Sequence, residues 1–266
     1  MSVAERVAEA GRVRPDPEAK GPLRSGPQHW IALVRTTLYR VTATVYFLLV
    51  TLISSWMLLM PQGAMRWAFS MWSRGDMFLL RWLGGQRVEV LGRENIPDGA
   101  ALVAAKHQSA WETLALIPLL PNGSIIMKKE LMQIPVYGRY ARHFGMISVD
   151  RTAGISALKQ LAQDAGDVLA EGRQVVIFPE GTRRPVGAAP DYKPGAIFLY
   201  ERLNVPIVPV ALNSGLLWPR GRYVRYPGTI TVSFLPQIPA GLDRKTAQAR
   251  LIEAIESESD RLAGLT

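Results

Sequence analysis

The sequence predicts an α/β fold with a mixed, largely parallel sheet covered by helices, preceded by an N-terminal apolar helical segment that associates with a membrane. Three observations support this prediction. From residue 86 onward, short apolar runs alternate with stretches of helical periodicity, a pattern typical of βαβ units. Several of these runs are apolar at every position, as expected for strands covered on both faces. Before them, the 25 residues between Arg40 and Arg66 carry no formal charge.

Residues 1–29 have the composition of a flexible tail. They contain four prolines, several glycines and charges of both signs, with little apolar periodicity. Such a segment buries too little apolar surface to offset the entropy lost on ordering. We therefore expect the folded chain to begin near residue 30.

Residues 30–85 are predicted to form a membrane-associating helical hairpin or anchor. Residues 41–60 are nearly all apolar, and about 20 such residues cross a hydrocarbon core of ~30 Å. After Pro61, residues 64–83 mix apolar and charged side chains and include three tryptophans, a composition typical of the membrane–water interface. The Lys and Arg residues flanking the apolar run are nearly balanced, so they select no orientation. A hairpin dipping into one leaflet, a true span and a buried helix pair within the globular fold all remain open.

Residues 86–266 are predicted to form the α/β domain. Apolar runs place strands at 87–91, 101–105, 124–127, 146–149, 174–178, 207–212 and 230–234. Longer periodic segments place helices at 111–120, 155–171, 196–202 and 244–262.

The composition excludes several kinds of site. The chain has no cysteine, which excludes disulfide scaffolds and thiol nucleophiles. Its three histidines argue against a multi-histidine metal centre, and we expect neither a metal nor another cofactor. The net charge of +9 indicates an anionic partner such as a phosphorylated molecule or a membrane surface. A dense basic helix is lacking, so nucleic acid is not expected as a partner.

The first candidate site is the segment Lys106–Glu112, which follows a predicted strand and opens a helix. His107 and Glu112 are five residues apart, which on one regular helix separates them by about 140°. They can meet only if His107 precedes the helix and Glu112 lies in its first turn. A carboxylate bonded to one ring nitrogen then supports proton uptake at the other. The alternative is a surface histidine beside an ordinary first-turn glutamate.

Cations follow several of the predicted strands. Lys128 follows 124–127, Arg151 follows 146–149, and Arg183 follows 174–178 within the turn Glu180-Gly181-Thr182-Arg183. The ends of parallel strands meet at one edge, so these cations are candidates for an anion pocket beside His107. Scattered, solvated charge is the commoner fate of Lys and Arg.

Four blocks together resemble the glycerolipid acyltransferase family. They are His-x4-acid at 107–112, Phe-Gly-x-Ile-x-x-Asp-Arg at 144–151, Phe-Pro-Glu-Gly-Thr-Arg at 178–183 and Val-Pro-Ile-Val-Pro-Val at 205–210. The acid of the first block is usually Asp in the family, and here it is Glu112.

The resemblance implies a glycerol-phosphate-acyltransferase-like fold and an acyl transfer reaction. It implies a fatty acyl group passing from acyl-CoA or acyl carrier protein to the sn-2 hydroxyl of lysophosphatidic acid, giving phosphatidic acid for phospholipid synthesis. His107 would be the base and Glu112 its partner. The acceptor's phosphate would be bound by Lys128, Arg151 and Arg183, with Glu180, Gly181 and Thr182 shaping the loop. The absence of a serine-hydrolase elbow and of cysteine favours direct transfer.

Several points stay open at this stage. The acceptor can be another lysolipid, such as a lyso-ornithine lipid, or the chain can be a non-catalytic membrane lipid-binding protein. The oxyanion donors are the backbone after His107 or the backbone near residues 205–209. We expect a membrane-associated protein on the cytoplasmic face of the inner or plasma membrane.

Overall fold

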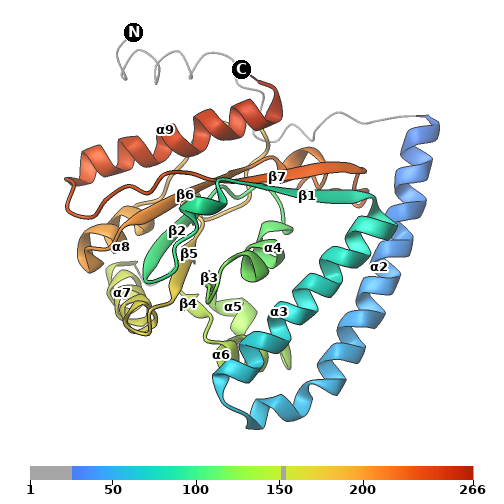
Figure 1. Ribbon diagram of the computed structural model, residues 1–266, viewed down its shortest axis with the longest axis horizontal. Coiled ribbons are helices and arrows are strands. Elements are labelled where there is room, and N and C mark those ends of the chain that lie inside the picture. The colour runs from blue at the N-terminus through green and yellow to red at the C-terminus, as the bar shows by residue number, and fades with distance from the viewer. Residues whose placement is uncertain (1–25, 151–153, 266) are drawn as a thin grey trace.

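The structure is a computed structural model that describes residues 26–150 and 154–265. An N-terminal helical hairpin packs against an α/β domain (Figure 1). The hairpin consists of α2 (Pro27–Ile53), the 3₁₀ turn η1 (Ser55–Leu59), α3 (Gln62–Leu79) and the π turn η2 (Leu80–Gly84). Most of the predicted tail lies outside the described residues, but its last three residues, Pro27 to His29, belong to α2. The helix begins early because proline suits a first helical turn, where its missing N–H has no partner to lose.

Within the described residues, seven strands form one sheet in the order β1-β7-β6-β2-β5-β3-β4. All neighbouring pairs are parallel except β6 and β7, which are antiparallel. The predicted mixed, largely parallel sheet is therefore confirmed. The strands are β1 (Gln86–Leu91), β2 (Ala101–Ala105), β3 (Ser124–Lys128), β4 (Ile147–Val149), β5 (Gln174–Ile177), β6 (Ile207–Leu212) and β7 (Gly228–Phe234).

Helices cover both faces of the sheet (Figure 1). Side chains alternate along the central strands: Val103 of β2 faces the core shared with the hairpin and α4, whereas Leu102 and Ala104 face the core shared with α7, α8 and α9. This two-sided burial is why the central strands read as unbroken apolar runs. The covering helices are α4 (Glu112–Leu119), α7 (Gly154–Ala170), α8 (Gly195–Leu203) and α9 (Arg244–Ala263).

Two helices were not predicted from the sequence. They are α5 (Lys129–Met132) and α6 (Tyr137–Phe144), and both lie between β3 and β4. Each is too short to repeat an apolar period, and Pro135 separates them. Helix α6 packs against α3 of the hairpin, and α5 packs against α6.

One face of the hairpin is bonded to the α/β domain. Ser73 Oγ on α3 donates to the Leu114 carbonyl on α4 at 2.6 Å. On α2, the Thr36 hydroxyl donates to the Arg225 carbonyl and accepts from the Arg225 N–H. Tyr39, also on α2, donates to Asp76 of α3 at 3.0 Å. The bonds of Ser73 and Thr36 fix one face of the hairpin on the domain, and the bond between Tyr39 and Asp76 joins its two helices.

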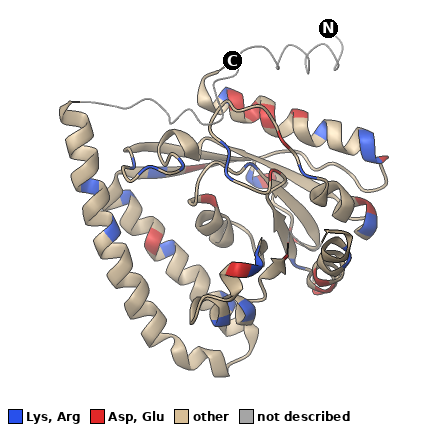
Figure 2. Cartoon of the chain, turned by 180° about the vertical axis from the view of Figure 1, so that it is seen from behind, with Lys and Arg blue, Asp and Glu red and all other residues tan. Residues whose placement is uncertain are grey.

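The other face of the hairpin is apolar and exposed. The uncharged stretch is a helix only to Ile53, then a turn, so residues 41–60 do not form one continuous helix as the run of 20 apolar residues predicted. The helix ends there because the hydroxyls of Ser54 and Ser55 donate to the carbonyls of Val50 and Leu52 in its last turn. Charges are confined to the upper part of α2, and the hairpin's end carries none (Figure 2). The exposed apolar residues of α2 and η1 include Leu38, Val45, Leu48, Leu49, Leu52, Ile53, Trp56 and Leu59.

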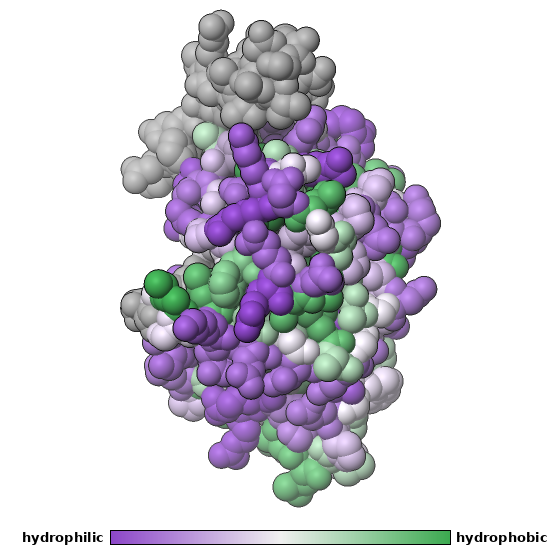
Figure 3. Space-filling view, turned by 90° about the vertical axis from the view of Figure 1, so that its left-hand side faces the viewer, coloured by the Kyte–Doolittle hydropathy of each residue, from purple (hydrophilic) through white to green (hydrophobic). Residues whose placement is uncertain are grey.

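An exposed apolar patch that runs along α2 and η1 is unusual on the surface of a soluble protein. Helix α2 is long and apolar enough to cross a membrane, with only 11% of its most apolar window buried. A buried helix pair inside the globular fold is therefore excluded for α2, although α3 does pack on α4. The face opposite the hairpin is hydrophilic over much of its area, with apolar side chains across its middle and at the lower end of the molecule (Figure 3).

Candidate active site

The candidate site lies at the edge where the five co-oriented strands β6, β2, β5, β3 and β4 end. The segment after β5 lies against the segment after β2, and the Arg184 N–H donates to the His107 carbonyl at 2.7 Å. The His107 ring also stacks on Phe178 with centroids 4.2 Å apart. The sequence blocks after β2 and β5 are thus brought together, as the parallel sheet predicted.

His107 and Glu112 form the pair that the spacing allowed. His107 lies in the loop after β2, and Glu112 is the first residue of α4. His107 Nδ1 lies 2.9 Å from Glu112 Oε1. An ionised carboxylate can only accept, so Nδ1 carries the proton and Nε2 is the basic nitrogen. The histidine side chain is 14% exposed, whereas that of Glu112 is fully buried.

Glu112 is held by donors on both carboxylate oxygens. Oε1 also accepts from the backbone N–H groups of Gln108 and Ser109, each at 2.7 Å. Oε2 accepts from the Ser109 and Ser214 hydroxyls at 2.7 and 2.9 Å. Burial works to raise the pKa of Glu112, but the hydrogen bonds from His107 and Ser109 outweigh it, and the net pKa lies below the usual value.

These contacts show two site residues that sequence reasoning missed. Ser109 lies inside the first block, and Ser214 follows β6 by two residues. The sequence signal that could have identified Ser214 is its position just after the central strand β6. The contacts also change one expectation: the N–H groups of Gln108 and Ser109 are directed at Glu112, so they do not serve as oxyanion donors.

A buried charge cluster supports the residue before His107. Lys106 is 2% exposed, and its Nζ bonds Glu180 Oε1 at 2.9 Å and Glu256 Oε1 at 2.7 Å. Tyr192 donates to the same Glu256 oxygen at 2.9 Å. The sequence placed Lys106 in the first candidate segment without a role and missed Glu256, because nothing in the spacing links β2 to a helix 150 residues later.

Glu180, predicted to shape the loop of the phosphate site, is buried beneath it. It is 1% exposed, and its second oxygen accepts from the His107 backbone N–H at 3.1 Å. Burial raises the pKa of Glu180, against the opposing effect of Lys106. The side chain is therefore buried and bonds the histidine backbone.

The other predicted phosphate ligands differ in placement. Gly181 makes the tight turn with φ of +64°, a conformation that suits glycine, and Thr182 is half-buried beside it. Arg183 is exposed next to the His107 loop, and Arg220 donates to its carbonyl. Lys128 is exposed at the end of β3, two strands from β2 and hence about 10 Å across the sheet. Arg151 lies outside the described residues.

Comparison with known proteins places the chain in a family. A family model described as Acyltransferase matches residues 87–213. A 1-acyl-sn-glycerol-3-phosphate acyltransferase of Pseudomonas aeruginosa is 37% identical over 192 residues, covering 72% of this chain and 75% of that protein. The human 1-acyl-sn-glycerol-3-phosphate acyltransferase alpha is 33% identical over 137 residues, covering 51% of this chain and 48% of that protein.

A solved structure agrees with the fold. The crystal structure of the 1-acyl-sn-glycerophosphate acyltransferase PlsC from Thermotoga maritima superposes with a TM-score of 0.71 at 23% identity, covering 87% of this chain and 96% of that one. The family model and the Pseudomonas aeruginosa relative show that the chain belongs to the glycerolipid acyltransferase family, and it is an enzyme.

Proposed function

We propose that this enzyme transfers a fatty acyl group from an acyl thioester to the sn-2 hydroxyl of 1-acyl-glycerol-3-phosphate and so makes phosphatidic acid. The observation that carries the proposal is the His107–Glu112 pair, 2.9 Å apart, at the sheet edge. The names of the relatives that share this fold and sequence support the choice of acceptor.

In the proposed reaction His107 acts as the general base. Its Nε2 takes the proton from the acceptor hydroxyl while that oxygen attacks the thioester carbonyl carbon. A carbon–oxygen bond forms, the carbon–sulfur bond breaks, and the imidazolium returns its proton to the leaving thiolate. Glu112 keeps Nδ1 protonated and stabilises the imidazolium that forms in between. General base catalysis of this kind contributes about 10²–10⁴-fold.

The acceptor's phosphate is proposed to lie on Arg183 and Lys128, with Arg151 as the third cation. Arg183 is the best supported of the three because its neighbour Arg184 bonds the His107 carbonyl. Its guanidinium can bind a phosphate through two parallel hydrogen bonds. In this arrangement the phosphate and the nucleophilic hydroxyl of one small molecule are held on adjacent loops.

The exposed face of the hairpin is proposed to dock into the cytoplasmic leaflet of the inner or plasma membrane. Both lipid substrate and product reside in a bilayer, so an interfacial enzyme need not carry their acyl chains through water. The break at residues 54–61 returns the chain to the side from which it entered. A hairpin in one leaflet therefore fits the geometry better than a full span does.

An acceptor panel tests the function. Purified protein in detergent is given acyl-CoA or acyl carrier protein thioesters with lysophosphatidic acid, lysophosphatidylcholine or a lyso-ornithine lipid, and products are identified by mass spectrometry. We expect phosphatidic acid as the main product, and its loss in His107→Ala. Equal or faster acylation of an acceptor without a phosphate monoester would contradict the proposed substrate. Normal activity of His107→Ala would contradict the mechanism.

A further inference from the structure

The connection between α5 and α6 exposes an apolar segment. Residues 133–136 are all exposed, with Ile134 at 46% and Val136 at 55%. Leu131, one turn earlier on α5, is 39% exposed. Exposing the side chains of Ile, Pro and Val to water contributes nothing to the stability of the fold.

The backbone of this loop is strained at Val136. Val136 has φ of +66° and ψ of −64°, and Tyr137 N donates to the Pro135 carbonyl at 2.7 Å. This is a γ-turn, which is rare and strained, and it is least favourable for a β-branched residue. Strain of this kind persists where the surrounding structure imposes it and often marks a functional segment.

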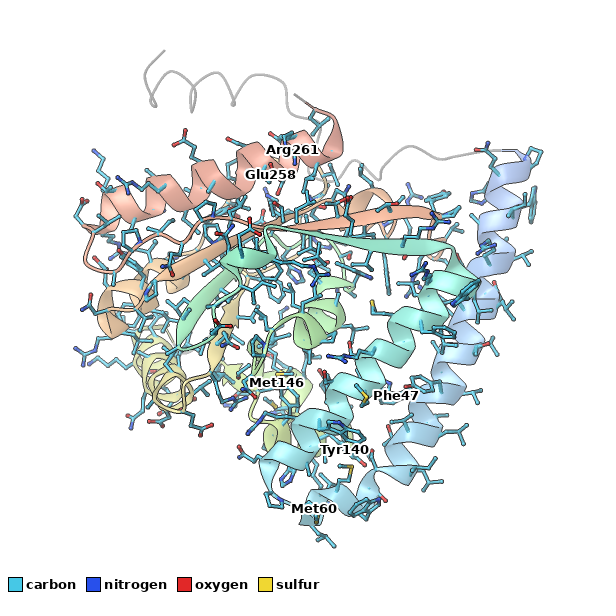
Figure 4. The ribbon with its side chains drawn as sticks, in the orientation of Figure 1. Phe47, Met60, Tyr140, Met146, Glu258 and Arg261 are labelled. Carbon is cyan, nitrogen blue, oxygen red and sulfur yellow. The ribbon has the colours of Figure 1, made fainter. Side chains whose placement is uncertain are left out.

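The loop is fixed to the end of the hairpin. Tyr140 of α6 donates its hydroxyl to the Thr51 carbonyl near the end of α2 at 2.7 Å. His143 Nε2 donates to the Met60 carbonyl at 2.8 Å. Tyr140 and Met60 lie together at the lower end of the molecule (Figure 4). The exposed loop and the hairpin end, where Leu59 is 90% exposed, therefore belong to one rigid apolar surface.

The charges on α6 complement an anionic lipid surface. The helix carries Arg139, Arg142 and His143 and no acidic residue. Arg142 donates to the Met132 carbonyl, while Arg139 is exposed. The nearest acidic residue on the preceding helix is Glu130.

We propose that the α5–α6 connection is a second membrane contact, inserting Ile134 and Val136 beside the hairpin end while Arg139 meets anionic head groups. Two contacts on one rigid body fix the tilt of the domain over the bilayer, which one hairpin alone leaves free to rotate. This role rests on the membrane docking proposed above for the hairpin.

The chain's lack of cysteine permits a clean test. Single-cysteine variants of the full chain, Ile134→Cys, Leu59→Cys and Glu253→Cys, are labelled with an environment-sensitive fluorophore. Glu253 is exposed on α9, and this helix lies at the opposite end of the molecule from the hairpin end (Figure 1). Each is mixed with vesicles of phosphatidylethanolamine and phosphatidylglycerol, with or without a nitroxide on the acyl chains.

At positions 59 and 134 we expect a blue shift in emission with vesicles and a loss of intensity with nitroxide lipid, and at position 253 neither. A response at 59 without one at 134 overturns the second contact and leaves the hairpin docking intact. Silence at both positions overturns the hairpin docking and the second contact together. An equal response at 253 also overturns it, because the label then reports non-specific adsorption.

Discussion

Replacing Glu112 by Gln should remove the charge behind His107 while leaving the site's shape in place. The amide oxygen can occupy the position of Oε1, where three N–H donors converge. The amide nitrogen then faces the hydroxyls of Ser109 and Ser214, which can rotate to accept. We therefore expect the folded structure and the correct histidine tautomer to survive the substitution.

The catalytic loss follows from the electrostatics. Unit charges separated by the 2.9 Å between His107 Nδ1 and Glu112 Oε1 attract by about 6 kcal/mol at an effective dielectric constant of about 20. The amide keeps the hydrogen bond and part of this attraction through its dipole. If about half is lost, kcat falls by about 100-fold, which corresponds to about 2.7 kcal/mol.

The assay is phosphatidic acid formation under saturating donor and acceptor, with circular dichroism to confirm folding. Glu253→Gln, the same chemical change at an exposed position on α9, is the matched control and should leave kcat unchanged. A Glu112→Gln enzyme with the wild-type kcat would show that the ion pair does not support the base, and the mechanism would have to be abandoned.

Three further predictions concern the surrounding groups. Glu256→Gln weakens the hold on Lys106 and, through it, on the His107 loop; we expect a lower melting temperature and a lower kcat at unchanged KM, and a raised KM instead would place Glu256 in binding. Arg183→Ala should raise the KM for lysophosphatidic acid about 10-fold or more, since hydrogen bonds to charged groups contribute about 1.5–3 kcal/mol, whereas Arg244→Ala on α9 should not; an unchanged KM would remove Arg183 from the phosphate site. The pKa of Glu112 is lower in the folded chain than in the unfolded chain. Its contribution to stability is therefore present above about pH 4.3 and is lost as pH falls through the folded pKa. Thermal melts should show that the melting temperature of the wild type exceeds that of Glu112→Gln by less and less below that pH, and a constant difference in melting temperature would contradict the assigned shift.

The sequence alone determined the strands that are buried on both sides. The predicted bounds of β2 and β6 match the structure residue for residue, because a strand covered on both faces reads as an unbroken apolar run with polar ends. The His107–Glu112 pair was also within reach, since a five-residue spacing permits contact only across a helix start. The four blocks and their order then identified the family.

The tertiary structure decided what depends on residues far apart in the chain. Glu180 was predicted to shape the loop of the phosphate site, but the sequence could not show that it bonds Lys106, which a helix near the C-terminus also binds through Glu256. Composition likewise could not separate a buried helix pair from a membrane hairpin, because both require the same apolar residues. Only the packing showed that one face of the hairpin is covered by the domain and the other is open. Local periodicity records whether a side chain avoids water, whereas the partner that shields it is set by the fold.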